Sequence, residues 1–204
     1  MSEDGLIARA KKGNGTAFNE LVERYQGALY NVAYRMLGNE QDAADATQEA
    51  FLSAYQGIGK YRGGSFRSWL LRIVTNASYD ILRRAKRCPT ESLDEGEEID
   101  WHEGVAAPGE PPEALAEQRD LSRRVQRALA RLPHTQRVTV VLVDLQGLSY
   151  AEAARVLRVP VGTVRSRLSR GRRAVRDRML RQVECIYAHQ GNGAPASAAV
   201  PEGG

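Results

Sequence analysis

Arginine and serine side chains recur at close spacing near the end of the chain, where they could bind phosphates or base edges. Between Thr163 and Val183 there are eight arginines and one acidic residue, Asp177. A planar guanidinium can hold a phosphate, or the O6/N7 edge of guanine, through two parallel hydrogen bonds, and a serine hydroxyl can bind either partner. A solvated basic face is the plain alternative, but this density of arginine favours nucleic acid. The candidate contacts are Thr163, Arg165, Ser166, Arg167, Ser169, Arg170 and Arg173.

Two helices joined by a tight turn are predicted to position these side chains. Ser149 and Glu152 form a capping-box pattern, so a short helix begins there. Pro160 fits the first turn of a helix but not its interior, so residues 158–160 form a turn before a second helix. An apolar stripe opposite the arginines consists of Val164, Leu168, Val175 and Met179. This pattern indicates a helix-turn-helix, a motif typical of DNA-binding proteins.

Charge is unevenly distributed along the 204 residues. The chain has 29 Lys and Arg against 25 Asp and Glu, but ten of these acids lie between Glu91 and Glu117, where there is no Lys or Arg. The rest of the chain is therefore strongly cationic, as expected for a partner of nucleic acid. The acidic stretch also contains Gly and Pro and has little periodicity, which predicts a flexible linker over residues 90–112.

The sequence contains no pattern of residues that indicates metal binding or catalysis. Cys88 and Cys185 lie far apart, and neither forms a metal-type spacing with the scattered histidines His102, His134 and His189. We find no nucleophile, no paired carboxylates in a suitable setting and no apolar run of the ~20 residues that span a bilayer. The acidic N-terminus lacks the apolar core of a signal peptide. The sequence thus predicts no cofactor, no metal, no catalytic residue and no membrane span, in a cytoplasmic protein with reduced thiols.

The first half of the chain predicts a separate helical module with an acidic face. A helix that begins near Asn39 is expected to direct inward Ala44, Thr47, Phe51 and Tyr55. Another side of the same helix gathers Asp42, Asp45, Gln48 and Glu49. A solvated face is the simpler interpretation, but an acidic patch on a basic domain would also suit a basic protein partner.

A glycine-rich loop and a helix with a polar face follow. The loop carries Lys60, Tyr61, Arg62, Gly63 and Ser65, and Ser65 caps the helix that runs to Arg87. The polar face of that helix consists of Arg72, Asn76, Tyr79 and Arg83. Unstacked bases stack on aromatic rings and offer their Watson–Crick edges to polar groups, so this region would suit single-stranded nucleic acid. Composition alone does not select this interpretation over an ordinary solvated surface.

Three motifs in both halves of the chain carry a family resemblance. They are Asp42-x-x-Asp45-x-x-Gln48-Glu49-x-Phe51; Phe66-Arg67-Ser68-Trp69-Leu70 with Asn76, Asp80, Arg83 and Arg84; and Leu132-Pro133-x-x-Gln136-Arg137 leading to Gly162-Thr163-Val164-Arg165-Ser166-Arg167-Leu168. In this order they resemble the extracytoplasmic-function (ECF) sigma factors, the small two-domain promoter-recognition subunits of bacterial RNA polymerase. The likeness covers about residues 5–87 and 113–182.

The resemblance implies a distinct partner for each region. The acidic face at residues 42–49 would dock on the clamp-helix coiled coil of the polymerase largest subunit. The loop at residues 61–65, together with Asn76, would take a flipped base of the minus-ten element. The helix-turn-helix arginines and serines would enter the major groove of the minus-thirty-five element, although Ser169 stands where some members carry an aromatic residue. The acidic linker would thread the polymerase, and an anti-sigma factor would hold the protein inactive until envelope or environmental stress.

The predicted organisation is all-α with two small domains. Residues 1–89 form sigma domain 2, residues 90–112 the acidic linker, residues 113–187 sigma domain 4, and residues 188–204 a disordered tail. One alternative is a free-standing, dimeric helix-turn-helix regulator, which would leave the acidic face and the linker without a role. The other is an enzyme that acts on nucleic acid, for which no catalytic constellation is present in the sequence.

Overall fold

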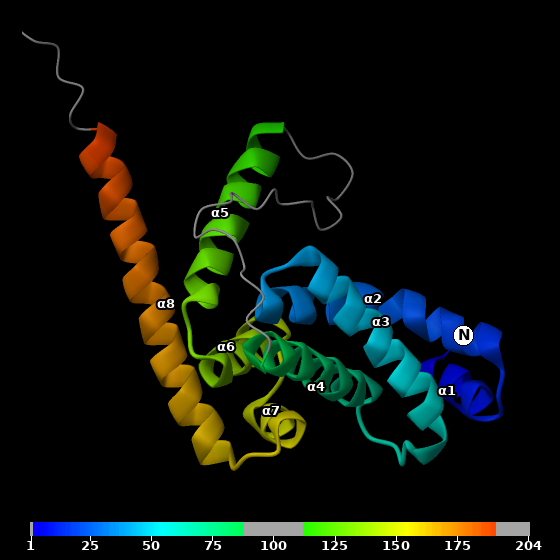
Figure 1. Ribbon diagram of the computed structural model, residues 1–204. Helices are drawn as coiled ribbons and strands as arrows, with labels where there is room; N and C mark the ends of the chain where they lie inside the picture. The colour runs from blue at the N-terminus through cyan, green and yellow to red at the C-terminus, as the bar shows by residue number, and fades with distance from the viewer. Residues whose placement is uncertain (1, 88–111, 191–204) are drawn as a thin grey trace, which may run out of the picture.

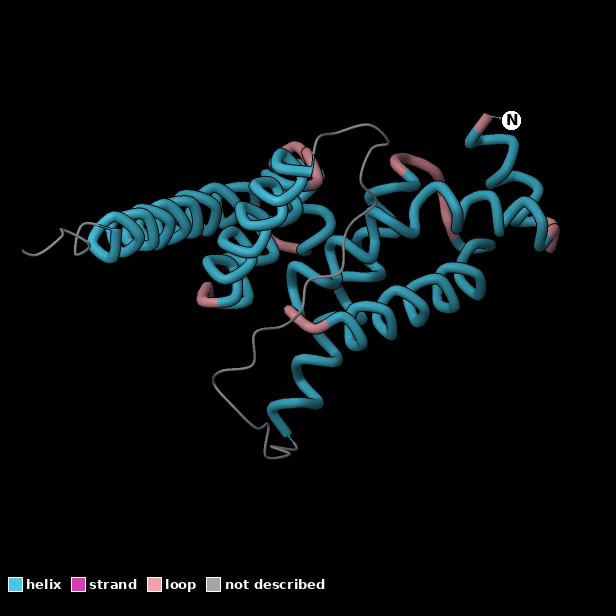
Figure 2. Tube along the Cα trace, turned by 90° about the horizontal axis from the view of Figure 1, so that it is seen from above, coloured by secondary structure: helices cyan, strands magenta, loops and turns pink. Residues whose placement is uncertain are grey.

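The computed structural model describes residues 2–87 and 112–190, with side chains at residues 2–85, 87, 118 and 120–181. Within these ranges every regular element is a helix (Figures 1 and 2), which confirms the all-α prediction. The predicted linker lies outside the described residues except for Pro112, where a helix begins. The last helix continues to Gln190, three residues into the predicted tail. Its continuation is expected, because residues 182–190 contain no helix-breaking Gly or Pro.

Helices of the first half begin and end at residues with clear local signals. They are α1 (Glu3–Lys11), α2 (Gly15–Leu37), α3 (Glu40–Gly57), the 3₁₀ turn η1 (Ile58–Lys60) and α4 (Phe66–Arg87). The side chains of Ser2, Asn14 and Asn39 accept hydrogen bonds from backbone N–H groups in the first turns of α1, α2 and α3. Gly38, at φ 80°, ends α2 in the left-handed conformation that glycine adopts without strain.

Helices of the second half form the predicted helix-turn-helix and its support. They are α5 (Pro112–Ala130), α6 (His134–Val140) with its π-helical continuation η2 (Val141–Leu145), α7 (Tyr150–Leu157) and α8 (Val161–Gln190). The capping box at Ser149 and Glu152 is present at the start of α7. Arg158 turns the chain at φ 54°, and Pro160 immediately precedes α8, so the predicted turn is confirmed.

Helix α3 buries a different face from the one we predicted. Four alanines are fully buried: Ala43, Ala46, Ala50 and Ala54. Because α3 packs against both α2 and α4, small side chains at spacings of three and four allow the neighbouring helices to come close. Of the residues expected to face inward, Ala44 is exposed and Tyr55 is 47% exposed, while Thr47 and Phe51 are half-buried. The prediction of the inner face was therefore wrong, and bulky apolar groups lie on its outer side.

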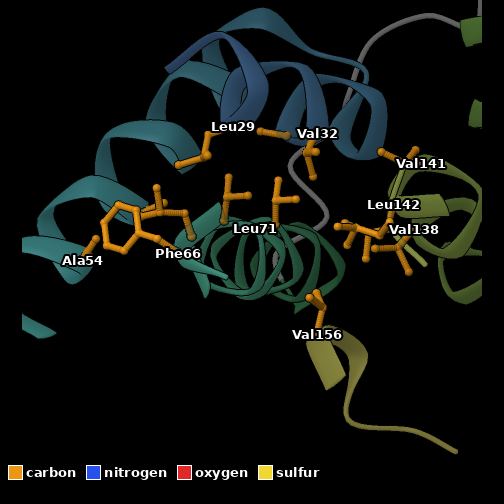
Figure 3. Close-up of a cluster of buried hydrophobic side chains, with 14 of the residues drawn as sticks. Leu29, Val32, Ala54, Phe66, Leu71, Val138, Val141, Leu142 and Val156 are labelled. Atoms are coloured by element: carbon orange, nitrogen blue, oxygen red, sulfur yellow. The ribbon is translucent and has the colours of Figure 1, made fainter. Parts of the chain in front are cut away.

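One apolar core around α4 joins the two halves of the chain. Leu71 and Val74 of α4 are fully buried. Figure 3 shows α4 nearly end-on, with Leu29 and Val32 of α2 on one side and Val156 of α7 on the opposite side. A third side is covered from α6 and η2 by Val138, Val141 and Leu142. The helix that carries the predicted single-strand face is thus enclosed by elements from both domains.

Hydrogen bonds between the halves gather at the C-terminal end of α2. Arg35 donates to the carbonyl oxygen of Ser122 and to Oε1 of Gln126, both at 3.2 Å. Gln126, only 2% exposed, donates in return to the carbonyl oxygen of Tyr34 at 3.2 Å. Burial lowers the pKa of Arg35 from its ordinary value. These hydrogen bonds join particular atoms of α2 and α5, which makes the contact between the two helices specific in register.

Two further arginines extend the contact between the halves. The buried side chain of Arg137 donates to the carbonyl oxygen of Met36 and, at 2.9 Å, to that of Leu129 near the end of α5. Arg67 of α4 donates to the backbone carbonyl and to Oε1 of Gln146, both at 2.8 Å. The two domains therefore form a closed arrangement, with polar links on both sides of the shared core.

Candidate nucleic-acid interface

The helix-turn-helix presents a basic face at the start of α8. Val164 and Leu168 are buried against the rest of the domain, so the opposite side of the helix faces outward. Arg165, Ser169, Arg170 and Arg173 are exposed there, while the other three predicted contacts, Thr163, Ser166 and Arg167, are half-buried. The Ser166 hydroxyl donates to the carbonyl oxygen of Thr163 at 3.0 Å, which leaves its lone pairs for an incoming donor.

The arginines of α8 fall into two groups by their contacts. Arg172 forms two hydrogen bonds to Asp144, at 3.0 and 2.5 Å, and this carboxylate raises the pKa of the Arg172 guanidinium. Arg178 donates to the carbonyl oxygens of Ala174 and Arg131. These two arginines hold α8 and its neighbours. Within the described part of the chain, the exposed arginines nearer the turn make no such bonds, and their contact with DNA stays a prediction.

The polar face of α4 lies where the sequence predicts, but its members differ in exposure. Asn76 and Arg83 are exposed, and Arg72 and Tyr79 are half-buried. Arg83 also donates to Asp80 at 3.0 Å, one helical turn earlier. In the loop before α4 the exposed residues are Lys60, Arg62, Gly63, Gly64 and Ser65. These positions form a surface that a nucleic-acid strand can reach.

Tyr61 is not the exposed stacking group that we expected. Only 7% of it is exposed, and its ring packs against Phe66 and Trp69 with centroids 5.3 Å away in both cases. Its hydroxyl donates to the carbonyl oxygen of Gly64 at 2.6 Å. An aromatic ring in contact with two others loses more by moving into water than an isolated one. Tyr61 therefore supports the loop from inside, and its polar neighbours form the outer surface.

The two predicted nucleic-acid surfaces lie near each other in this structure. Helix α7 packs on α4, and Figure 1 shows the start of α8 close to α7. Burial raises the pKa of Tyr79 on α4 above its ordinary value. The positive charges of Arg167 and Arg83 offset part of this rise. Arg167 of the helix-turn-helix thus lies within electrostatic reach of a residue predicted for a different DNA element. Fold and charge bring together side chains that are 88 positions apart in the chain.

The acidic face of α3 is open and borders an apolar groove. Asp45, Gln48 and Glu49 are exposed, and Asp42 is half-buried. The groove between α2 and α3 is lined chiefly by Phe18, Val22, Gln48, Phe51, Leu52 and Tyr55. Leu52 is 52% exposed, and the Phe18 and Tyr55 rings make an edge contact at 5.0 Å. Exposed apolar groups beside carboxylates are a surface suited to a partner protein.

Sequence reasoning missed the groove because it placed the wrong side of α3 inside. The alanine repeat at residues 43, 46, 50 and 54 was the available signal, since it continues at helical spacing through the whole helix. Over the described parts of the chain, no group of three or more His, Cys, Asp or Glu could hold a metal ion. In those same residues no helix is long and apolar enough to cross a membrane.

Comparisons with known families match both halves. Residues 21–88 match Sigma-70 region 2, and residues 122–175 match Sigma-70, region 4. Helix α4 and the loop before it fall in the first match, and the helix-turn-helix falls in the second. The ECF sigma factor SigW of Bacillus subtilis is 36% identical in an alignment of 178 positions that covers 85% of this chain and 94% of SigW. The chain belongs to the ECF sigma factors of the sigma-70 family.

Other relatives and a solved structure support the same family membership. SigM of Mycobacterium tuberculosis is 41% identical, over 84% of this chain and 81% of SigM. SigE of Mycolicibacterium smegmatis is 40% identical over 79% of this chain, which spans 61% of that longer protein. CnrH, solved in complex with the cytosolic domain of CnrY, matches with a TM-score of 0.62 at 28% identity, over 84% of this chain and 93% of CnrH. The fold is thus shared with the solved structure of CnrH.

Proposed function

We propose that this chain directs RNA polymerase to its promoters as an ECF sigma factor, with each of its two domains reading one promoter element. The observation that carries the proposal is the joint presence of three surfaces on one small protein. These are the basic face of α8, the polar face of α4 with its loop, and the acidic face of α3. A DNA-binding repressor needs only the first of them. A subunit that docks on polymerase, opens DNA and holds an upstream element needs all three.

The minus-thirty-five contact is assigned to the first turns of α8. Thr163, Arg165, Ser166 and Arg167 lie in the first two turns of α8, where side chains of a recognition helix reach base edges. Ser169, Arg170 and Arg173 lie one or two turns further on and are suited to phosphates or to a second base. The exposed arginines have free donors in the described structure, and a bidentate arginine–guanine pair is the commonest specific contact in the major groove.

The minus-ten contact is assigned to the loop at residues 60–65 and the polar face of α4. Asn76 is exposed on the polar face of α4. Its side-chain amide can both donate to and accept from the Watson–Crick edge of a base. Lys60, Arg62 and Arg83 supply positive charge for the phosphates around it. Arg72 and Tyr79 are half-buried, and Tyr79 lies within electrostatic reach of Arg167, so Tyr79 should become more accessible when the two domains separate.

Docking on core polymerase is assigned to the acidic face and the adjoining groove. Asp42, Asp45, Gln48 and Glu49 supply charge and hydrogen bonds, and Leu52 and Tyr55 supply apolar area. Such a combination fits a helix with a basic side and an apolar side. Family membership supports a cytoplasmic, non-catalytic protein under the control of an anti-sigma factor, with the acidic linker threading the polymerase between the two DNA-binding domains.

Promoter-specific transcription is the experiment that tests the proposal. The purified full chain is mixed with core polymerase and a library of promoter fragments, and start sites are mapped. We expect initiation at a defined class of promoters only when chain and core are both present, and little binding of the free chain to the same fragments. Failure to co-elute with core, combined with a footprint of a dimer on a palindrome, would instead identify a free-standing regulator.

A further inference from the structure

Helix α1 lies before the matched sigma regions and is attached to the domain at both ends. Its apolar residues Leu6, Ile7 and Ala10 are buried in the common core. Near its start, Glu3 accepts a hydrogen bond from the Tyr25 hydroxyl. Burial, followed by this hydrogen bond, raises the pKa of Tyr25 to about 12. The helix is therefore a rigid part of the domain and not a loosely attached extension.

The last residue of α1 contacts the loop that precedes α4. The ammonium of Lys11 donates to the backbone carbonyl oxygen of Tyr61 at 2.5 Å. The same nitrogen lies 5.2 Å from the centroid of the Tyr61 ring, within the range of a cation–π contact. Lys11 thus holds Tyr61 by its backbone and by its ring. Lys12, the next residue, is exposed like Lys11, but in the described part of the chain it has no contact with Tyr61.

Tyr61 in turn determines the path of the exposed part of the loop. Its hydroxyl donates to the carbonyl oxygen of Gly64, which closes residues 61–64 into a compact turn. Gly63 and Gly64 have φ of 96° and 93°, values at which residues with a Cβ are strained. Because these glycines have a wide range of accessible conformations, the turn needs an external contact to keep one shape. Lys11 provides that contact from a helix that is itself held in the core.

We infer that Lys11 is a positioning residue for the minus-ten loop: it fixes Tyr61, and through Tyr61 the loop at residues 62–65 that meets the flipped base. The inference rests on the proposed function of that loop. A base pocket discriminates among bases only when its donors and acceptors are held at a fixed geometry. Loosening the loop should therefore weaken discrimination between bases more than it weakens overall binding.

Two variants and one control test this role in holoenzyme made with the full chain. Lys11→Ala removes both contacts, Lys11→Arg keeps a cation and a donor, and Lys12→Ala removes the same charge at the neighbouring exposed position. Open-complex formation is measured on promoters that carry each of the four bases at every minus-ten position. For Lys11→Ala we expect the preference for one base over the others at one minus-ten position to fall about fivefold. This factor corresponds to the loss of one hydrogen bond between the loop and the base. Lys11→Arg should largely restore it, and Lys12→Ala should leave it unchanged.

A spectroscopic signal reports on the loop independently of DNA. The chain has two tryptophans, so Trp101→Phe leaves Trp69, which packs on Tyr61, as the only one. In this background Lys11→Ala should increase quenching of Trp69 by acrylamide, because the covering loop is released. Either result alone, unchanged quenching of Trp69 or unchanged base preference, would overturn the inference.

Competing explanations give different outcomes. If Lys11 binds a DNA phosphate, Lys11→Ala will weaken binding to all promoters equally. The slope of log K against the logarithm of the salt concentration will then become shallower by about one. That result would overturn the positioning role. If Asn76→Ala flattens base preference but Lys11→Ala does not, the minus-ten assignment stands and the inference about Lys11 is wrong. If neither variant alters any preference, the loop and α4 do not read the minus-ten element, and the proposed function of this surface fails.

Discussion

Hydrogen-bonding capacity separates the arginines of α8 that hold the structure from those available to DNA. Arg172 is bound twice to Asp144, whereas Arg165 and Arg170 are exposed near the turn. A side chain already satisfied within the protein must break its contacts before it can bind a base. The difference predicts which substitutions affect recognition and which affect only the fold.

Arg165→Ala is expected to reduce recognition at one position of the minus-thirty-five element by ~1–3 kcal/mol, since a bidentate guanidinium contact is lost. The measurement is holoenzyme binding to promoters mutated at each upstream position. Arg176→Ala is the matched control, because Arg176 is exposed on the same helix but bonds to Asp177. An equal loss on every promoter would identify Arg165 as a phosphate contact.

Asp45→Arg is expected to weaken binding to core polymerase by about tenfold or more, since a charge at a complementary interface is reversed. Asp45 is exposed, so thermal unfolding should be nearly unchanged. Glu23→Arg makes the same reversal at an exposed position of α2 outside the acidic face. Core binding can be followed by fluorescence anisotropy of labelled protein. Equal affinities for the Asp45 variant and the wild type would remove the acidic face from the docking surface.

Close approach between helices explains one glycine in the interior of α8. A Cβ added to Gly171 would lie 2.7 Å from Cγ2 of Val140, a side chain that is itself buried in α6. Gly27 in α2 is exposed, and an added Cβ there would have nothing within 4 Å. Only the first glycine is therefore required by packing.

Gly171→Ala is expected to destabilise the protein by ~1–3 kcal/mol through overpacking, because β-branched Val140 cannot move aside freely. Gly27→Ala should instead stabilise it by about 0.5–1 kcal/mol, the usual gain of alanine in a helix. Urea unfolding of the two variants measures both effects. Stabilisation of similar size in both would mean that α6 and α8 are not in close contact.

The capping box of α7 predicts a dependence of stability on pH. The Ser149 hydroxyl and N–H donate to Oε2 of Glu152 at 2.7 and 2.9 Å, and these bonds lower the pKa of the carboxyl group. A lowered folded-state pKa contributes stability above the unfolded value of about 4.3, and this contribution disappears as pH falls through the folded-state pKa. The wild type should therefore exceed Glu152→Gln in thermal stability at neutral pH, and the gap should narrow on acidification. A gap that stays constant with pH would contradict the charge-based part of the cap.

Under the proposed assignment of one promoter element to each domain, the closed arrangement of the whole molecule cannot hold both elements at once. The two elements lie about 25 base pairs apart, roughly 85 Å along DNA at 3.4 Å per base pair. Here Arg167 of the helix-turn-helix is within electrostatic reach of Tyr79 on α4. The residues between the domains, about 25 in number, can extend to ~80 Å. The proposed assignment of one element to each domain therefore predicts that the domains separate when the protein binds a promoter.

We expect energy transfer between dyes on α3 and α8 to fall when holoenzyme forms on a promoter. Gln56→Cys and Arg181→Cys, in a background with Cys88→Ser and Cys185→Ser, provide exposed labelling sites. Gln126→Ala should open the free protein in part, since it breaks the buried bonds to Arg35 and Tyr34. Gln118→Ala, at an exposed position of the same helix, is the control. Transfer that stays unchanged on the promoter would show that the domains remain docked.

Local signals were sufficient to predict most elements of this protein. Ser149 with Glu152, Pro160 and Gly38 each act through neighbouring backbone groups, so the helix-turn-helix and the end of α2 could be predicted from the sequence. Apolar periodicity likewise identified α4 and its polar face. The polymerase and DNA contacts at these surfaces remain predictions, because they depend on partners outside the chain.

Tertiary structure alone decided which of several helical faces became buried. Alanines, and not Phe51 and Tyr55, face inward on α3, because that helix must come close to two others at once. Tyr61 is covered by aromatic groups of α4 and held by Lys11, 50 residues earlier. The docking of the second domain on α4 also depends on residues far apart in sequence. Short-range sequence patterns carry no information about contacts between residues far apart in the chain. The free energy of each such contact is gained only when the remote partners are in place.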